Sequence, residues 1–106
     1  MTKKKRENKE GSGVGIADRK KVEPPKKYNV VLLNDDYTPM NFVSDLLQRL
    51  FHKPATEAEQ ITLLVHNTGK GIAGTYSREI AETKAYEVKI NAVNSGYPLI
   101  AEIQPE

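Results

Sequence analysis

The chain has 106 residues, of which 38% are hydrophobic and 28% are charged, and it contains no cysteine. This length accommodates one small domain, and a chain without cysteine has no disulfide bond, thiolate nucleophile or sulfur-ligated metal. No apolar run approaches the roughly 20 residues that cross a bilayer, so we expect a cytoplasmic protein with no membrane partner.

The charges are distributed unevenly along the chain. The first 27 residues hold ten Lys or Arg and four Asp or Glu, whereas the rest hold six and ten, so the net charges are +6 and −4. The first part also has too few apolar residues to offset its ordering entropy. We therefore predict a disordered basic extension over residues 1–25 and a folded domain over residues 26–106. The extension lacks aromatic residues and the domain is acidic, so we expect no nucleic-acid partner.

The domain begins with an apolar segment that ends in a polar turn. Residues 28–33 are rich in β-branched side chains, which predicts a strand, and Asn34-Asp35-Asp36 stops it. Thr38 and Pro39 are typical of a helix start, with the hydroxyl as the cap and the proline at the first helical position. Apolar residues at helical spacing continue this first helix to about residue 51: Val43, Leu46, Leu47 and Leu50.

A second helix is predicted after Pro54. Thr56 and Glu59 have the spacing of a capping box, in which each side chain bonds a free backbone N–H at the helix start. Gly69 is expected to end this helix, because glycine readily adopts the left-handed conformation found after a last turn. The apolar stripe comprises Ala58, Ile61 and Val65.

The pattern of the last third of the domain predicts a strand, a helix and another strand. Residues 72–76 form the second strand, Ser77 is placed to cap a third helix, and Gly96 ends that helix. The inner face of the helix comprises Ala81, Ala85, Val88 and Ala92. Residues 98–103 alternate in the pattern of a last strand. The order β-α-α-β-α-β predicts an α+β fold, a two-layer α/β sandwich with three helices on one face of a three-stranded antiparallel sheet.

The segment Asn34-Asp35-Asp36 sets two carboxylates and an amide between a strand and a helix. Local pattern is compatible with a polar turn or with a site completed by His66 of the second helix, although a lone histidine beside apolar positions is commonly part of a core. The chain has only His52 and His66 as imidazoles and no serine or cysteine in a nucleophile setting. We therefore expect no metal, no cofactor and no catalytic residue.

Four segments together resemble the bacterial ClpS adaptor family: Val31–Met40, Val65-His66, Gly69–Gly71 and Glu82–Lys84. The resemblance extends over residues 28–103. It implies a non-enzymatic N-end-rule adaptor, which binds clients that begin with Phe, Leu, Tyr or Trp and delivers them to the ClpA unfoldase of the ClpAP protease. The implied partners are these N-degron clients and the N-terminal domain of ClpA, and the implied state is a monomer.

The resemblance also assigns roles to individual residues. The α-amino group of a client would be held by Asn34, Asp35 and His66. Contact with the unfoldase would involve Glu79 and Lys84 on the third helix. The first side chain of the client would enter a pocket lined by Thr38, Met40, Val43, Thr62, Val65 and Leu99.

Thr62 departs from the family pattern, in which this position often carries a bulky Met. A threonine leaves more space and a hydroxyl near the client ring, so we expect weaker binding of Leu relative to Trp or Tyr. The role of Asp36 stays open between shaping the loop and adding negative potential. The local pattern is also that of a different interaction module, a ribosomal-stalk type of domain that docks translation factors through its helices and has no amino-group pocket.

Overall fold

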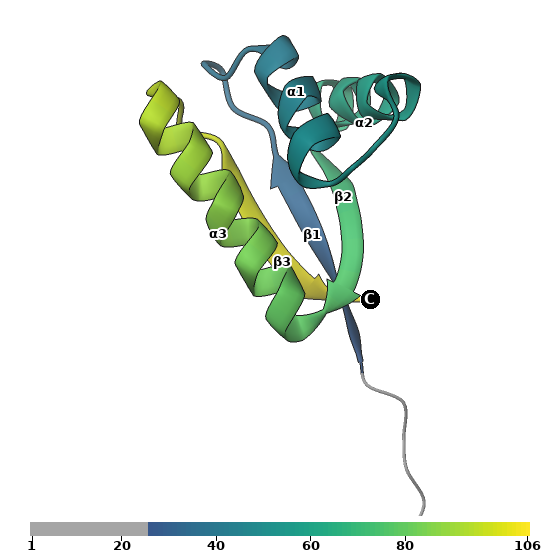
Figure 1. Cartoon of the computed structure of the whole chain (residues 1–106). Coiled ribbons are helices and arrows are strands. Elements are labelled where there is room, and N and C mark those ends of the chain that lie inside the picture. The colour runs from purple at the N-terminus through teal and green to yellow at the C-terminus, as the bar shows by residue number, and fades with distance from the viewer. Residues whose placement is uncertain (1–25) are drawn as a thin grey trace, which may run out of the picture.

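The computed structural model describes residues 26–106, and the predicted basic extension lies outside the described residues. The predicted order of strands and helices is confirmed (Figure 1). The elements are β1 (Lys27–Leu33), α1 (Met40–Leu50), α2 (Ala55–Thr68), β2 (Lys70–Ser77), α3 (Arg78–Ser95) and β3 (Ile100–Pro105). No helix within residues 26–106 combines the length and apolar character needed to cross a membrane.

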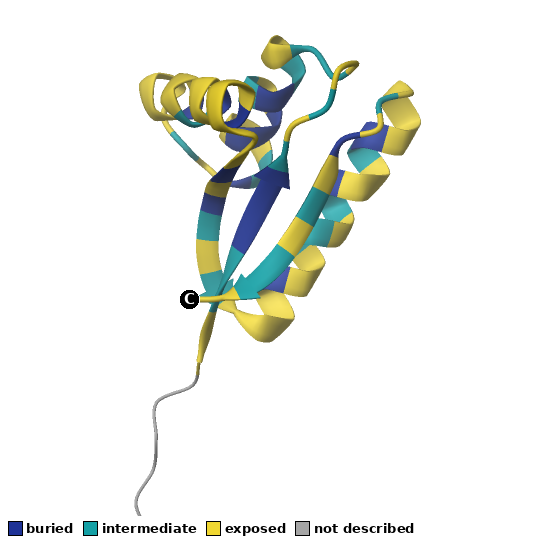
Figure 2. Ribbon diagram, turned by 180° about the vertical axis from the view of Figure 1, so that it is seen from behind, coloured by how far each residue is buried: buried dark blue, intermediate teal, exposed yellow. Residues whose placement is uncertain are grey.

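The three strands form one antiparallel sheet in the order β2-β1-β3, so the first strand of the chain is the central one. Val30 and Leu32 on β1 are fully buried and belong to the core beneath the helices. In the view from behind, no helix of the described chain lies across the opposite face of the sheet (Figure 2). Val31, between Val30 and Leu32, is also buried at 3% exposure, and the core cluster lies on the face of the sheet that the helices cover, as in an α+β fold.

The helices divide the covered face between them. α3 contacts all three strands, whereas α1 packs mainly against α2, and α2 reaches the sheet through β2. The predicted inner residues of α3 are buried except Ala85, which is half-buried. The helices and the sheet enclose a single core cluster: Val30, Leu32, Val43, Leu46, Leu47, Phe51, Ala58, Val65, Ala73, Ala81, Val88, Ala92 and Leu99.

The predicted side-chain cap bonds at the helix starts are wrong, although the helices are in place and Ser77, Gly69 and Gly96 hold the predicted cap positions. Pro39 rather than Thr38 is the N-cap of α1, and Pro54 is the N-cap of α2, each with extended backbone and no side-chain cap bond. Thr56 and Glu59 therefore form no capping box, and Ser77, which is the N-cap of α3, makes no cap bond through its hydroxyl. The proline ring fixes φ near −65°, which suits a residue that leads into a helix without donating a hydrogen bond.

Two glycines decide how α2 meets the sheet. Gly69 ends α2 as predicted, with φ of 97°, and its N–H donates to the carbonyl oxygen of Val65 at 2.9 Å. Gly71 is buried on β2, and a Cβ there would lie 2.9 Å from Cγ2 of Val65. A side chain at position 71 would push Val65 away, so glycine lets α2 pack closely on β2.

Candidate functional site

The loop between β1 and α1 is folded around the carboxylate of Asp35. Its Oδ1 accepts hydrogen bonds from the backbone N–H groups of Tyr37 at 2.8 Å and Thr38 at 2.7 Å. Its Oδ2 accepts a third bond, from the Thr38 hydroxyl at 2.7 Å. The Thr38 hydroxyl is thus engaged by a charged acceptor, which explains why it does not cap α1.

Two opposing effects set the charge of Asp35. Partial burial raises its pKa, but the hydrogen bonds from the Thr38 hydroxyl and from the backbone of Tyr37 and Thr38 lower it, and the net pKa lies below the ordinary value of 3.8. Asp35 is therefore ionised at neutral pH. A carboxylate has about four acceptor positions, and three are used within the loop, so one remains for a further donor.

A pair of backbone hydrogen bonds ties this loop to the end of α2. The N–H of Asn34 donates to the carbonyl oxygen of Gly69 at 2.9 Å, and Gly69 in turn is bonded to Val65. His66 follows Val65 directly, and both Asn34 and His66 are exposed. The structure thus brings the backbone of Asn34 against the turn of α2 that carries His66. Asn34 and His66, which are 32 positions apart in sequence, thus lie on segments that are bonded to each other.

The predicted pocket residues fall into two groups. Three of them are almost fully buried and belong to the core cluster. They are Val43 on α1, Val65 on α2 and Leu99 in the segment before β3. Met40 is 39% exposed at the first turn of α1, and Thr38 is half-buried in the loop. In the predicted pocket, the three core residues are the apolar base and Met40 is the accessible apolar side chain.

Thr62 is buried at 4% exposure, and its hydroxyl donates to the carbonyl oxygen of Ala58 at 2.7 Å. The hydroxyl hydrogen is therefore used inside α2. A hydroxyl at this position could act toward a client only as an acceptor, so the main consequence of threonine here is its small size.

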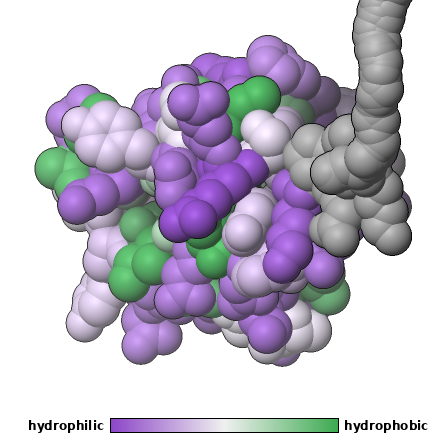
Figure 3. Space-filling model, turned by 90° about the horizontal axis from the view of Figure 1, so that it is seen from below, coloured by the Kyte–Doolittle hydropathy of each residue, from purple (hydrophilic) through white to green (hydrophobic). Residues whose placement is uncertain are grey.

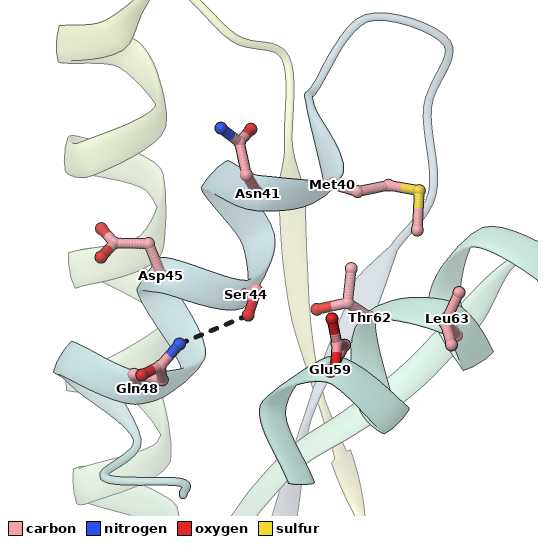
Figure 4. Close-up of a pocket in the computed structure, with 8 residues that line it drawn as sticks. All are labelled: Met40, Asn41, Ser44, Asp45, Gln48, Glu59, Thr62 and Leu63. Atoms are coloured by element: carbon pink, nitrogen blue, oxygen red, sulfur yellow. Dashed lines mark hydrogen bonds between the residues drawn. The ribbon is translucent and has the colours of Figure 1, made fainter. Parts of the chain in front are cut away.

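A groove of about 500 Å³ lies between α1 and α2 (Figure 4). Met40 and Thr62 belong both to this groove and to the predicted pocket. Sequence reasoning missed the other groove residues because polar side chains on a helix normally indicate a solvated face. The remaining lining residues are Asn41, Ser44, Asp45, Gln48, Glu59 and Leu63.

Residues 23–102 match the family model described as ATP-dependent Clp protease adaptor protein ClpS. The chain belongs to the ClpS family. ClpS proteins are non-catalytic adaptors of the ATP-dependent Clp protease, which confirms the predicted adaptor class.

The chain matches its relatives over most of the length of both proteins. The chain is 47% identical over 94 residues to the Clp protease adapter protein ClpS of Vibrio atlanticus, covering 89% of each chain. It is 50% identical over 86 residues to ClpS of Hydrogenovibrio crunogenus, covering 81% of this chain and 83% of the relative. The solved structure of Agrobacterium tumefaciens ClpS2, bound to L-phenylalaninamide, superposes with a TM-score of 0.76 and 37% identity, covering 78% of this chain and all of that one.

The two residues predicted for ClpS contact with the unfoldase have different surroundings. Glu79 is exposed in the first turn of α3. Lys84 is only 20% exposed, and its Nζ donates to the carbonyl oxygen of Leu50 at 2.6 Å and lies 6.0 Å from the Phe51 ring centroid. Its distance to Oε1 of Glu87 is 4.0 Å. Lys84 therefore joins α3 to the last turn of α1, where carbonyl groups lack helical partners.

The end of the molecule seen from below in Figure 3 has a mostly hydrophilic surface with scattered hydrophobic residues. α3 begins at this end. A partner that docks beside Glu79 would therefore meet a polar surface, and its binding would depend on hydrogen bonds and charge more than on a large apolar contact.

The hydrogen bonds to Asp35 predict a pH-dependent contribution to stability. The pKa of Asp35 is lower in the folded protein than in the unfolded chain. The stabilisation is therefore present at pH values above the pKa of the unfolded chain and is lost as the pH falls through the pKa of the folded protein. Asp35→Asn should reduce the free energy of unfolding by about 1–2 kcal/mol at pH 7. The difference from the unsubstituted protein should shrink when urea unfolding is repeated near pH 3. An equal difference at both pH values would contradict the assigned role of the charge.

Proposed function

We propose that this chain binds the free α-amino group and the bulky hydrophobic first side chain of client proteins, Phe, Leu, Tyr or Trp, and delivers them to the ClpA unfoldase of ClpAP. The observation that carries the proposal is the docking of the Asp35 loop on the end of α2 through Asn34 and Gly69. Asn34 immediately precedes the ionised Asp35, and Gly69 ends the helix that bears His66 and contributes Val65 to the core. The binding of L-phenylalaninamide by the similar ClpS2 supports it.

The polar groups fit the chemistry of a protein N-terminus. An α-ammonium group has three N–H donors, and it is attached to the carbon that bears the first side chain. Asp35 supplies the countercharge through its remaining acceptor position, the Asn34 side chain offers a carbonyl acceptor, and His66 offers a ring nitrogen. A lysine ammonium sits at the end of a flexible stem, so it could approach these acceptors while leaving the apolar base empty.

The apolar groups supply the other half of recognition. Burial of a large side chain against Val43, Val65 and Leu99 contributes about 1.5–3 kcal/mol, and each charge-assisted hydrogen bond contributes about 1.5–3 kcal/mol. After the cost of association, a roughly micromolar affinity results. Such an affinity permits transfer of the client to the unfoldase. Met40 at the rim crowds the atoms next to the client backbone, which disfavours β-branched first residues.

Delivery requires a second contact, which we assign to the N-terminal domain of ClpA. Glu79 is exposed and available for it, whereas Lys84 contributes chiefly by holding α3 against α1. We propose that the chain acts as a monomer in the cytoplasm. Residues 1–25 lie outside the described range, and a chain of 25 residues spans at most about 80–90 Å when extended. We propose that this segment contacts the unfoldase while a client is bound.

Fluorescence anisotropy with labelled peptides tests the proposal directly. Peptides that differ only in Phe or Met at the first position are compared, each with a free or an acetylated amino group. We expect roughly micromolar binding of the free Phe peptide and at least tenfold weaker binding of the other three, because only that peptide satisfies both halves of the site. Equal binding of the acetylated Phe peptide would exclude recognition of the amino group.

Thr62→Met tests the effect of pocket size on selectivity. A methionine would fill space beside Met40 that a small client side chain leaves empty. Because each buried CH₂ is worth about 0.8 kcal/mol, the affinity for a Leu-initiated peptide should rise roughly fourfold relative to a Trp-initiated one. The two peptides are titrated against both proteins, and an unchanged affinity ratio would show that Thr62 does not set the preference.

Glu79→Gln and Lys84→Met separate the surface role from the interior one. Lys84→Met keeps the aliphatic stem but removes the bond to Leu50, so it should lower the free energy of unfolding by about 1–3 kcal/mol. Glu79→Gln should stay within about 0.5 kcal/mol of the unsubstituted protein while weakening binding to the ClpA N-terminal domain. Urea unfolding and a pull-down with that domain measure the two effects. Unaltered stability of Lys84→Met would reject its structural role.

A further inference from the structure

The groove between α1 and α2 exists because small residues face each other where the helices diverge. Ser44 on α1 and Thr62 on α2 both line it, and neither carries a side chain long enough to fill the space. Met40 extends from the first turn of α1 toward α2 (Figure 4), and Leu63 adds an apolar wall. The groove therefore combines an apolar rim with polar side chains along its length.

The charges of the groove are all negative. Asp45 and Glu59 both line it, and no Lys or Arg is among the lining residues. The Asp45 carboxylate is neutralised in part by Arg49 at 2.7 Å. Glu59 forms no ion pair with any residue of the described range 26–106. Among residues 26–106, the Glu59 carboxylate is thus a groove acceptor without a cationic partner, at the side formed by α2.

The groove shares Met40 and Thr62 with the predicted client pocket. We place the exit of the client chain past Met40, because Met40 is 39% exposed whereas Val43 and Val65 are almost fully buried. Each extended residue advances the chain by about 3.3 Å, so the second and third residues of a client leave within reach of the groove. A lysine or arginine stem is long enough to pack on Met40 and Leu63 and present its cation to Glu59.

We propose that the α1–α2 groove binds a Lys or Arg side chain at the second or third position of the client. This inference rests on the proposed function and adds a second element of selectivity to it. A cationic side chain suits both parts of the lining, since its stem covers the apolar rim and its charge meets Glu59. An acidic side chain would be repelled, and a purely apolar one would cover polar groups without giving them a partner.

The experiment uses the full chain and free-amino peptides that begin with Phe and carry Lys, norleucine or Glu at the second or third position. Norleucine has the same stem as lysine without the charge. Affinities are measured for the unsubstituted protein, for Glu59→Gln and for Glu57→Gln. Glu57 lies on the same helix and pairs with Lys53 at 3.6 Å, outside the groove lining, so its substitution changes the net charge equally.

We expect the Lys peptide to bind about three- to fivefold more tightly than the norleucine peptide, the size of an exposed ion pair. The advantage should vanish in Glu59→Gln, persist in Glu57→Gln and decline as salt is raised. An equal loss of the advantage in both variants would point to the general field of the acidic domain and overturn the groove as its source. So would equal affinities for Lys and norleucine in the unsubstituted protein.

The peptide set also separates this inference from the function on which it rests. If no free-amino Phe peptide binds, the proposed recognition of N-terminal residues fails and the groove proposal fails with it. If the norleucine peptide binds and loses affinity on acetylation, the amino-group site stands. The comparison of Lys with norleucine then decides the groove alone.

Discussion

The site depends on one carboxylate that folds its own loop. Asp35 accepts three hydrogen bonds within the segment that follows β1, and these bonds fix the path of the chain from the central strand to α1. The same bonds keep the group ionised despite its partial burial. Structural and recognition roles therefore do not compete: the bonds that hold the carboxylate in place also maintain the negative charge that an ammonium ligand needs.

The second constraint is the close packing of α2 on β2. Gly71 lets Val65 approach the strand, and the left-handed Gly69 turns the chain so that its carbonyl oxygen meets Asn34. The proposed amino-group ligands come from the Asp35 loop and the end of α2, and these two glycines hold those segments together. A rigid scaffold of this kind limits the entropy lost when a client binds, which allows a small domain to reach a useful affinity.

The proposed selectivity depends on how α1 is set against α2 and α3. Lys84 anchors the last turn of α1 to α3, while the first turn carries Met40 at the rim of the pocket. Toward α2, the small Ser44 and Thr62 leave a groove that larger residues would fill. Val43, Leu46 and Leu47 of this helix are buried in the core and Phe42 and Leu50 pack against it, whereas Ser44 and Asp45 face the groove.

The sequence by itself determined the order of elements, the polar loop after β1 and the family, because apolar spacing, glycine positions and the run Asn34–Met40 are local properties of the chain. It did not determine what Thr38, Glu59 or Lys84 contact. Thr38 turns to Asp35 instead of capping α1, Glu59 faces a groove instead of a helix start, and Lys84 reaches across to Leu50. Each of these depends on how one element is set against another, and such contacts are decided by tertiary packing.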